Sequence, residues 1–406
     1  MELLKQYRVA VLGEPDAGKS TLVKSLVESL TGRVLSTDTL MKEVHWSDGR
    51  DPDGNPDTRT IKCAKVMFKY GDYEWCFYDA PGHLEYSDQI GQAVRDADFI
   101  LFLIHDSYPK RGSEYMKGIL SEQAERCVLY THSGKTKMEL NCGFYDVKSP
   151  DFHAFAVDLM DYILKELAKR GSAPHDIESE ALELIRENVD PNKRNVMFFS
   201  AGKDSALGLS LVEKAGLKDA VEYWFPNSGY DFPEVEQMRL EYEKYFSVKI
   251  TRFGNSLGRT YERDGAFLMM EAKALSNEAF IDVQNKIEQI DKVLVQYRAS
   301  DEGVRSKDYH LSERANHTRF SPVFYFSETN VWRYLEKYNV PVCTLYFEGY
   351  RSLGDEPVTK PCMASLSTKV EIVEWIENHP NTTERDGRTG QDGNNTMEKV
   401  RDIGFF

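Results

Sequence analysis

The sequence predicts two doubly wound α/β domains that follow one another along the chain. A chain of 406 residues is too long for one ordinary hydrophobic core, so two domains are expected. In both halves short apolar runs alternate with helical patterns, the order that builds a parallel sheet covered by helices. Each half also contains a strand, a turn of small residues with a lysine, and the start of a helix. We therefore place the first domain at residues 1–168, a linker at residues 169–176 and the second domain at residues 177–406.

The first strand–turn–helix unit has an apolar strand at Tyr7–Leu12 and a helix at Thr21–Leu30. Residues 13–20 between them read G-E-P-D-A-G-K-S, the G-x-x-x-x-G-K-S pattern of a phosphate-binding loop. In such a loop, backbone amides wrap the β-phosphate, the lysine bridges the β- and γ-phosphates, and the serine holds Mg²⁺. The predicted nucleotide-binding residues are Gly13, Asp16, Gly18, Lys19, Ser20 and Thr21, and Ser20 is also a predicted metal ligand.

A second phosphate-facing string follows the strand predicted at Trp75–Tyr78. It reads D-A-P-G-H, with Asp79 as a metal-ligand candidate, Gly82 as an N–H donor to a γ-phosphate, and His83 placed to orient an attacking water. This string resembles the translation elongation GTPases and, more closely, the GTPase subunit of bacterial sulfate adenylyltransferase. The resemblance implies a P-loop GTPase domain that binds GTP and Mg²⁺, with Thr60 as the threonine that contacts the metal.

The sequence departs from that family at the base-recognition motif, where the family carries N-K-x-D after a strand. Here the strand Cys127–Tyr130 is followed by T-H-S-G, and T-K-M-E-L comes five residues later. Lys137 and Glu139 are the candidates for base contacts, and both a guanine site and a relaxed or adenine-preferring site stay open. The family's GTPase subunit continues into β-barrels, for which the helix predicted at Phe155–Lys169 and the following linker leave no room. A homo-oligomer and a partner that supplies those barrels are the open alternatives for assembly.

The second strand–turn–helix unit has a strand at Asn195–Phe199 and a helix at Ala206–Gly216. Residues 200–205 read S-A-G-K-D-S, and small residues at a helix N-terminus let backbone N–H groups approach phosphate oxygens. The string resembles the S-G-G-K-D-S loop of the ATP-pyrophosphatases, which split ATP between its α- and β-phosphates. It implies ATP as substrate. The predicted catalytic residues are Ser200, Lys203 and Ser205, and the predicted nucleotide contacts are Gly202 and Asp204.

Alternation of strands and helices continues after this loop and favours a second parallel sheet with ligands at the carboxyl ends of its strands. The predicted elements are the helix Ile177–Asn188 before the loop and, after it, strands at Ala220–Phe225, Val248–Phe253 and Lys292–Gln296 with helices at Glu234–Tyr245 and Glu328–Tyr338.

Three C-terminal strings resemble the ATP-using subunit of sulfate adenylyltransferase. They are R-S-L-G-D-E-P-V-T at residues 351–359, T-E-R-D-G-R at residues 383–388, and T-M-E-K followed by a terminal G-F-F at residues 396–406. The resemblance implies Arg351 as a sulfate contact, with Arg298 or Arg305 as the alternative. Related iron–sulfur reductases need a cysteine pair to ligate their cluster, and Asp355 and Val358 stand in those places.

Composition narrows the classes of function. A net charge of −15 argues against a nonspecific nucleic-acid binder, and no apolar run is long enough to span a bilayer. Six cysteines without a C-x-x-C pair, and an N-terminus without a secretion signal, favour a cytoplasmic protein with reduced thiols.

Three hypotheses follow from these patterns. The first is a fused, GTP-dependent sulfate adenylyltransferase with nucleotides and sulfate as ligands. The second is an enzyme that adenylates or thiolates another acceptor, or a relative of phosphoadenylyl-sulfate (PAPS) reductase without an iron–sulfur cluster. The third is a nucleotide-responsive switch that binds without turnover.

Overall fold

The computed structural model divides into two compact units. It describes residues 1–13, 17–35, 42–44, 58–60, 63–82, 87–104, 127–131, 143–144, 152–227, 230–254, 290–301, 309–313, 317–356 and 359–388. One unit is formed by Leu4–Ile177 with Ala299–Asp308, and the other by Met1–Leu3, Glu178–Arg298 and Tyr309–Phe406.

The N-terminal unit is built on a six-stranded sheet of order β4-β5-β1-β6-β7-β8. Its strands are β1 (Lys5–Gly13), β4 (Ala64–Tyr70), β5 (Tyr73–Asp79), β6 (Phe99–Ile104), β7 (Cys127–Thr131) and β8 (Gly143–Phe144). Only the pairing of the edge strand β4 with β5 is antiparallel; the other pairs are parallel. A separate antiparallel pair joins β2 (Lys42–Val44) and β3 (Thr58–Thr60).

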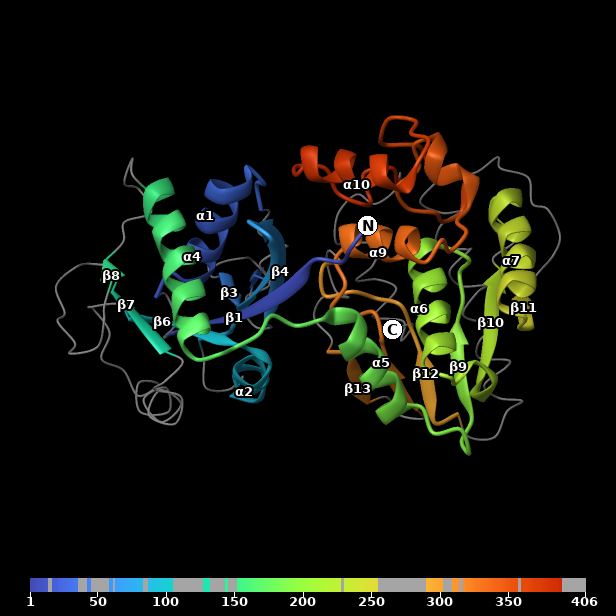
Figure 1. Cartoon of the computed structure of the whole chain (residues 1–406), viewed down its shortest axis with the longest axis horizontal. Helices are drawn as coiled ribbons and strands as arrows, with labels where there is room; N and C mark the ends of the chain where they lie inside the picture. The colour runs from blue at the N-terminus through green and yellow to red at the C-terminus, as the bar shows by residue number, and fades with distance from the viewer. Residues whose placement is uncertain are drawn as a thin grey trace. The chain divides into compact units, whose positions relative to one another are not determined.

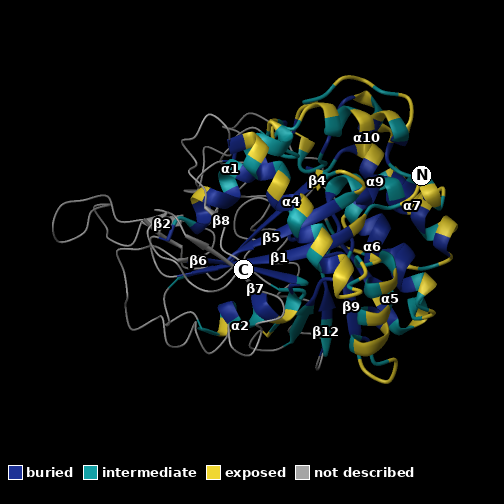
Figure 2. Ribbon diagram, turned by 60° about the vertical axis from the view of Figure 1, so that its left-hand side comes forward, coloured by how far each residue is buried: buried dark blue, intermediate teal, exposed yellow. Residues whose placement is uncertain are grey.

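Helices α1 (Lys19–Thr31), α2 (Ser87–Asp96) and α4 (Phe152–Lys169) complete the described part of this unit. Apolar side chains of β1 and β5 meet those of α1 and α4 in one hydrophobic core. Figure 2 shows the result as dark blue strands next to helices that are buried on one side only. Since β1 ends where α1 begins after a short turn, this core fixes the position of the first predicted phosphate loop.

The C-terminal unit is built on a second six-stranded sheet, of order β11-β10-β9-β12-β14-β13. Its strands are β9 (Asn195–Phe198), β10 (Val221–Asn227), β11 (Ile250–Gly254), β12 (Lys292–Leu294), β13 (Leu311–Glu313) and β14 (Thr318–Phe320). The edge strand β13 is antiparallel to β14, and the remaining pairs are parallel. Two mainly parallel sheets with helices confirm the predicted fold class.

The helices of the C-terminal unit include two that pack directly on the loop helix. The described helices are α5 (Ile177–Asn188), α6 (Lys203–Lys214), α7 (Pro233–Phe246), α9 (Glu328–Lys337) and α10 (Lys369–Asn378), with a 3₁₀ turn at Thr344–Glu348. α6 packs against α7 and α9, and α9 packs in turn against α10 (Figure 1). A Cβ atom on Gly208 of α6 would lie 2.8 Å from Cε of Met197, so a glycine permits this close approach of the helix to β9.

Several helices differ from the sequence prediction. α2 was not predicted, and α1 and α4 begin at Lys19 and Phe152 rather than at Thr21 and Phe155. α6 begins at Lys203 rather than Ala206, because Gly202 adopts an extended conformation and serves as the N-cap. α10 was not predicted. Its start is fixed by a capping box, in which the Thr368 side chain accepts from the N–H of Glu371 and the Glu371 side chain accepts from the N–H of Thr368.

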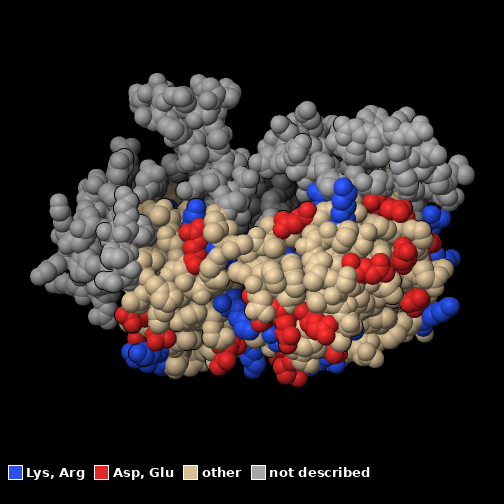
Figure 3. Space-filling view, turned by 90° about the horizontal axis from the view of Figure 1, so that it is seen from above, with Lys and Arg blue, Asp and Glu red and all other residues tan. Residues whose placement is uncertain are grey.

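The surface carries both signs of charge. Figure 3 shows acidic and basic side chains interspersed over the described part of the face that it displays. Among the helices that the structure describes, none is long and apolar enough to cross a membrane.

Candidate functional site

The first phosphate loop is shaped by two glycines. Gly13 ends β1 with φ 151°, and a Cβ atom there would lie 2.3 Å from the carbonyl oxygen of Leu103 on β6. Gly18 adopts the left-handed conformation (φ 85°) as the N-cap of α1. Both positions therefore require glycine, the first for close approach and the second for backbone conformation. Between them, Ala17 is fully buried, and residues 14–16 lie outside the described part of the chain.

Lys19 lies in the first turn of α1 and folds back over the loop. Its side chain is buried, and its Nζ donates a hydrogen bond to the carbonyl oxygen of Gly13 at 3.1 Å. The lysine thus spans the loop from the helix to the end of β1, which is where it would meet the phosphates of a bound nucleotide. Thr21, two residues after Lys19 in α1, is exposed.

Ser20 and Asp79 supply oxygen donors at the same edge of the sheet. Asp79 is fully buried at the end of β5, in register with Val11 of the neighbouring strand β1, and Ser20 is buried in the first turn of α1. A hydroxyl and a carboxylate are hard oxygen ligands, and Mg²⁺ is commonly bound by one or two such groups together with phosphate oxygens and water. The donor set therefore fits Mg²⁺. Among the described residues, no group of three or more His, Cys, Asp or Glu side chains could hold a metal.

Several residues predicted for the first site fall outside what the structure describes. They are Asp16, His83, Lys137 and Glu139, together with the side chain of Thr60, whose backbone belongs to β3. Gly82 is described and is partly exposed, three residues beyond the end of β5.

The second phosphate loop joins β9 to α6 through a left-handed residue. Ala201 has φ 55° and is fully buried, so an alanine occupies a conformation that glycine adopts without strain. The hydroxyls of Ser200 and Ser205 lie 2.9 Å apart, and the N–H of Ser200 donates to Oγ of Ser205 at 3.0 Å. Oγ of Ser205 also donates to Oε1 of Gln296 at 3.3 Å. The two predicted serines are thus brought together, with a glutamine that the sequence did not indicate.

The N–H of Lys203 donates to the hydroxyl of Tyr346 at 3.0 Å. Tyr346 comes from the 3₁₀ turn Thr344–Glu348 and is almost fully buried. Burial raises the pKa of this phenol, although the nearby Lys203 acts in the opposite direction. Tyr346 therefore stays a neutral hydroxyl that holds the start of α6 in place.

Four ionised side chains gather at the start of α6. The cations are Lys203 and Arg298, and the carboxylates are Asp204 and Glu384. Nζ of Lys203 lies 3.1 Å from Asp204, and Nε of Arg298 lies 3.0 Å from the other oxygen of that carboxylate. Glu384 bonds both cations, one through each carboxylate oxygen. The cluster has two positive and two negative charges, and each cation contacts both carboxylates.

Burial makes this charge balance necessary. The side chains of Lys203 and Arg298 are only 1% and 2% exposed. Burial by itself would lower the pKa of Lys203, but the charges of Asp204 and Glu384 outweigh it and raise that pKa. Burial would likewise raise the pKa of Glu384, but Arg298 and Lys203 hold it far below the ordinary range. Lys203 and Glu384 are therefore both charged at neutral pH.

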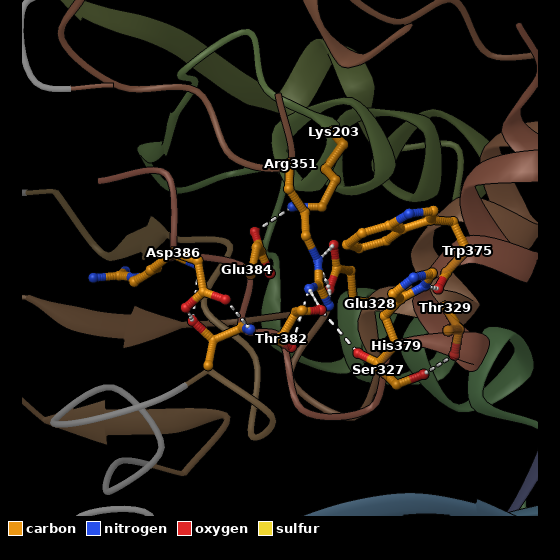
Figure 4. A network of polar contacts seen from close by, with 12 residues as sticks. Lys203, Ser327, Glu328, Thr329, Arg351, Trp375, His379, Thr382, Glu384 and Asp386 are labelled. Carbon is orange, nitrogen blue, oxygen red and sulfur yellow. Dashed lines mark hydrogen bonds and ion pairs between the residues drawn. The ribbon is translucent and has the colours of Figure 1, made fainter. Parts of the chain in front are cut away.

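Arg351, the predicted sulfate contact, lies next to this cluster and is held by other partners (Figure 4). Its Nε and Nη2 donate to the carboxylate of Glu328, at 3.1 and 2.8 Å, and its Nη1 donates to the carbonyl and hydroxyl oxygens of Thr382. Because Thr382 lies two residues before Glu384, Arg351 anchors the turn that carries Glu384.

A second arginine anchors the far side of that turn. Nη2 of Arg388 donates to Oγ of Ser352 at 2.8 Å and to the carbonyl oxygen of Leu353 at 2.5 Å. A Cβ atom on Gly354 would fall 1.3 Å from Nη1 of Arg388, so only glycine admits the guanidinium here. Together these contacts fix residues 382–388 against residues 351–354.

The structure thus brings most residues predicted for the second site together at the start of α6. Lys203, Asp204, Ser200, Ser205 and Gly202 form its loop. Arg298 joins the loop lysine through shared carboxylates, and Arg305 lies outside the described residues. Sequence reasoning missed the roles of Glu384, Gln296 and Tyr346. Glu384 stands inside a string that resembled a known family, but nothing in its spacing indicated a contact with Lys203.

Two family descriptions match separate parts of the chain. Residues 5–130 match the elongation factor Tu GTP binding domain, and residues 194–361 match the phosphoadenosine phosphosulfate reductase domain. The matched ranges contain the first and the second phosphate loop, respectively. They confirm the predicted fusion of a GTPase domain to a domain of this reductase type.

Curated relatives of the chain include several proteins named sulfate adenylyltransferase subunit 2. That of Rhizobium johnstonii is 25% identical over 313 residues, covering 59% of this chain and 95% of the relative. A Rhizobium etli protein of the same name is 24% identical over 309 residues, with the same coverage. A probable FAD synthase of Caenorhabditis elegans is 25% identical over 282 residues, covering 64% of this chain and 50% of that protein.

Solved structures give more distant similarities. Phosphoadenylyl-sulfate reductase from Candida auris, in a phosphate complex, has a TM-score of 0.36 at 16% identity and covers 44% of this chain and 90% of that chain. Candida glabrata FMN adenylyltransferase with FMN and an ATP analogue has a TM-score of 0.37 at 16% identity, covering 56% and 79%.

Proposed function

We propose that this chain transfers the adenylyl group of ATP to sulfate. It joins a GTP-binding domain of the elongation factor Tu type to a domain of the phosphoadenosine phosphosulfate reductase type. The observation that carries the proposal is a buried pair of cations at the start of α6. Lys203 comes from the loop that follows β9, and Arg298 comes from the segment that follows β12. Relatives named sulfate adenylyltransferase subunit 2 support sulfate as the acceptor.

The proposed reaction needs no nucleophilic side chain. A sulfate oxygen attacks the α-phosphorus of ATP, the bond from that phosphorus to the bridging oxygen breaks, and pyrophosphate leaves with the bond's electrons. The work of the protein is to position the reactants and to neutralise charge that develops on the leaving group. Lys203 supplies that charge beside the serine hydroxyls of the loop, and Arg298 supplies a second, planar donor.

Hydrolysis of GTP in the N-terminal domain would drive this uphill transfer. Each factor of ten in an unfavourable equilibrium constant costs about 1.4 kcal/mol. Hydrolysis of a second nucleotide offsets this cost only when the two sites share a conformational change. Lys19 would contact the GTP phosphates from the helix side of its loop, and Ser20 and Asp79 would hold Mg²⁺. When bound, the metal neutralises charge on the phosphate oxygens.

The test is pyrophosphate release from ATP and sulfate, followed while GTP is titrated. We expect release to rise with GTP in the wild type and to be lost in Lys203→Ala. In Lys19→Ala we expect release to become independent of GTP, with GTP hydrolysis reduced about a hundredfold. Release without any response to GTP in a folded wild type would refute the coupling. If neither substitution changes any turnover, the protein is a binding module and the enzymatic proposal fails.

A second candidate is transfer of AMP to a different acceptor, and the relative named a probable FAD synthase favours a flavin. Incubation with α-labelled ATP distinguishes the candidates, because the label appears in adenylyl sulfate in one case and in FAD in the other. Parallel reactions with sulfate, FMN and RNA also cover adenylation of a nucleic acid. Label in FAD alone would replace sulfate by a flavin in the proposal.

A further inference from the structure

The two buried cations contact carboxylates that are more exposed than they are. Lys203 and Arg298 are 1% and 2% exposed, whereas Glu384 is 20% exposed and Asp204 is 23% exposed. Glu384 contacts Nζ of Lys203 with one oxygen and Nη2 of Arg298 with the other. The carboxylate therefore bridges the same two groups that an incoming phosphate would need, and it is more exposed than either cation.

We infer that Glu384 is an internal competitor of the ligand: its carboxylate and a diphosphate group bind the same two cations, Lys203 and Arg298, and exclude one another. The inference rests on the proposed function, since it places the pyrophosphate part of ATP at this loop. It adds a residue to the site that no loop motif contains and that lies 181 positions along the chain from Lys203.

Charge balance decides which ligands can make this exchange. Two buried cations need compensating negative charge, and removing one partner of a buried ion pair without replacement is strongly destabilising. A diphosphate carries enough negative charge, and enough oxygens, to replace Glu384 at both cations at once. A ligand with one weakly charged group would leave a cation uncompensated. Competition with Glu384 therefore favours the binding of polyphosphates over that of singly charged anions.

The fold allows the exchange to be a side-chain movement. The turn that carries Glu384 is held on one side by Arg351, which bonds Thr382, and on the other by Arg388, which bonds Ser352 and Leu353. Within the turn, Asp386 accepts from the N–H and hydroxyl of Thr383, at 2.8 and 2.6 Å. The backbone is therefore fixed, and the partly exposed Glu384 side chain can rotate toward solvent without unfolding the turn.

The experiment measures binding of inorganic pyrophosphate to the full chain by titration calorimetry. Glu384→Gln removes the charge and keeps the size of the side chain. We expect it to bind pyrophosphate roughly tenfold more tightly than the wild type, within the range usual for coupled equilibria. Glu374→Gln, the same substitution at an exposed position of α10, is the matched control and should bind as the wild type does.

The outcomes separate this inference from the proposed function. Unchanged or weaker binding in Glu384→Gln, with binding lost in Lys203→Ala, would overturn the competition and leave the phosphate site standing. Undiminished binding in Lys203→Ala would overturn the site itself. If Glu384→Gln does not fold, a crystal structure of the wild type with pyrophosphate decides. We expect phosphate oxygens on Lys203 and Arg298, with Glu384 rotated away. A bound pyrophosphate with Glu384 still bonded to both cations would refute the inference.

Discussion

Replacement of Arg351 by methionine tests whether this residue is an anchor or a sulfate contact. The side chains of Arg351 and Glu328 are 6% and 11% exposed, and they form a two-pronged ion pair. Without Arg351, the Glu328 carboxylate is buried beside no opposite charge, which costs about 3–5 kcal/mol. Glu328 is the first residue of α9, where the helix dipole returns roughly 0.3–1 kcal/mol. The two hydrogen bonds to Thr382 are lost as well, at about 1 kcal/mol each.

These terms place the expected loss at about 5 kcal/mol, concentrated in α9 and the turn at residues 379–388. Unfolding of a two-domain chain need not be two-state, so amide hydrogen exchange of peptides from these segments is the suitable assay. Exchange in both segments should be faster in Arg351→Met, and the double variant with Glu328→Gln should recover part of the loss because neither charge is then left unpaired.

Activity separates the two roles. An anchor predicts that Glu328→Gln impairs turnover as Arg351→Met does, since both release the turn that carries Glu384. A sulfate contact predicts that only Arg351→Met raises the KM for sulfate. Exchange rates of Arg351→Met equal to those of the wild type would refute the reasoning from burial.

Three further predictions concern single side chains. Because the pKa of Glu384 is lower in the folded protein than its ordinary value of 4.5, its contribution to stability is complete above about pH 4.5 and is lost as the pH falls toward the lowered value. In acid titrations, Glu384→Gln should therefore reduce the pH dependence of unfolding by up to about 1.4 kcal/mol per pH unit, and an unchanged slope would contradict this. Burial raises the pKa of Cys63 and Cys76 to about 12, so both thiols stay protonated at pH 8. Their alkylation, measured by mass spectrometry, should therefore be about a thousandfold slower in the folded chain than in urea. Ala201→Gly should change the free energy of unfolding by less than about 1 kcal/mol, because relief of the left-handed conformation offsets the loss of a buried methyl group. Ala201→Val should lower it by about 2 kcal/mol or more. Equal melting temperatures for the two variants would exclude strain at this turn.

The sequence predicted the structure best where residues close together along the chain determine it. The strand before residues 13–20 and the helix after them, and the same order around residues 200–205, follow from apolar runs, small residues and helix starts within a dozen positions. Such local rules also located both phosphate loops, and with them Lys19, Lys203 and the paired serines. The alternation of strands and helices was enough to predict two mainly parallel sheets.

The partners of the buried charges were decided by tertiary structure alone. Glu384 meets Arg298 across 86 positions and Lys203 across 181, and no periodicity relates residues so far apart. Arg351 resembled an anion-binding residue in the sequence, yet its place beside Glu328 and Thr382 depends on how α9 and the C-terminal turn pack. A sequence states which side chains carry charge, because charge belongs to the residue. Which charges neutralise one another depends on burial and distance, and only the folded chain fixes these.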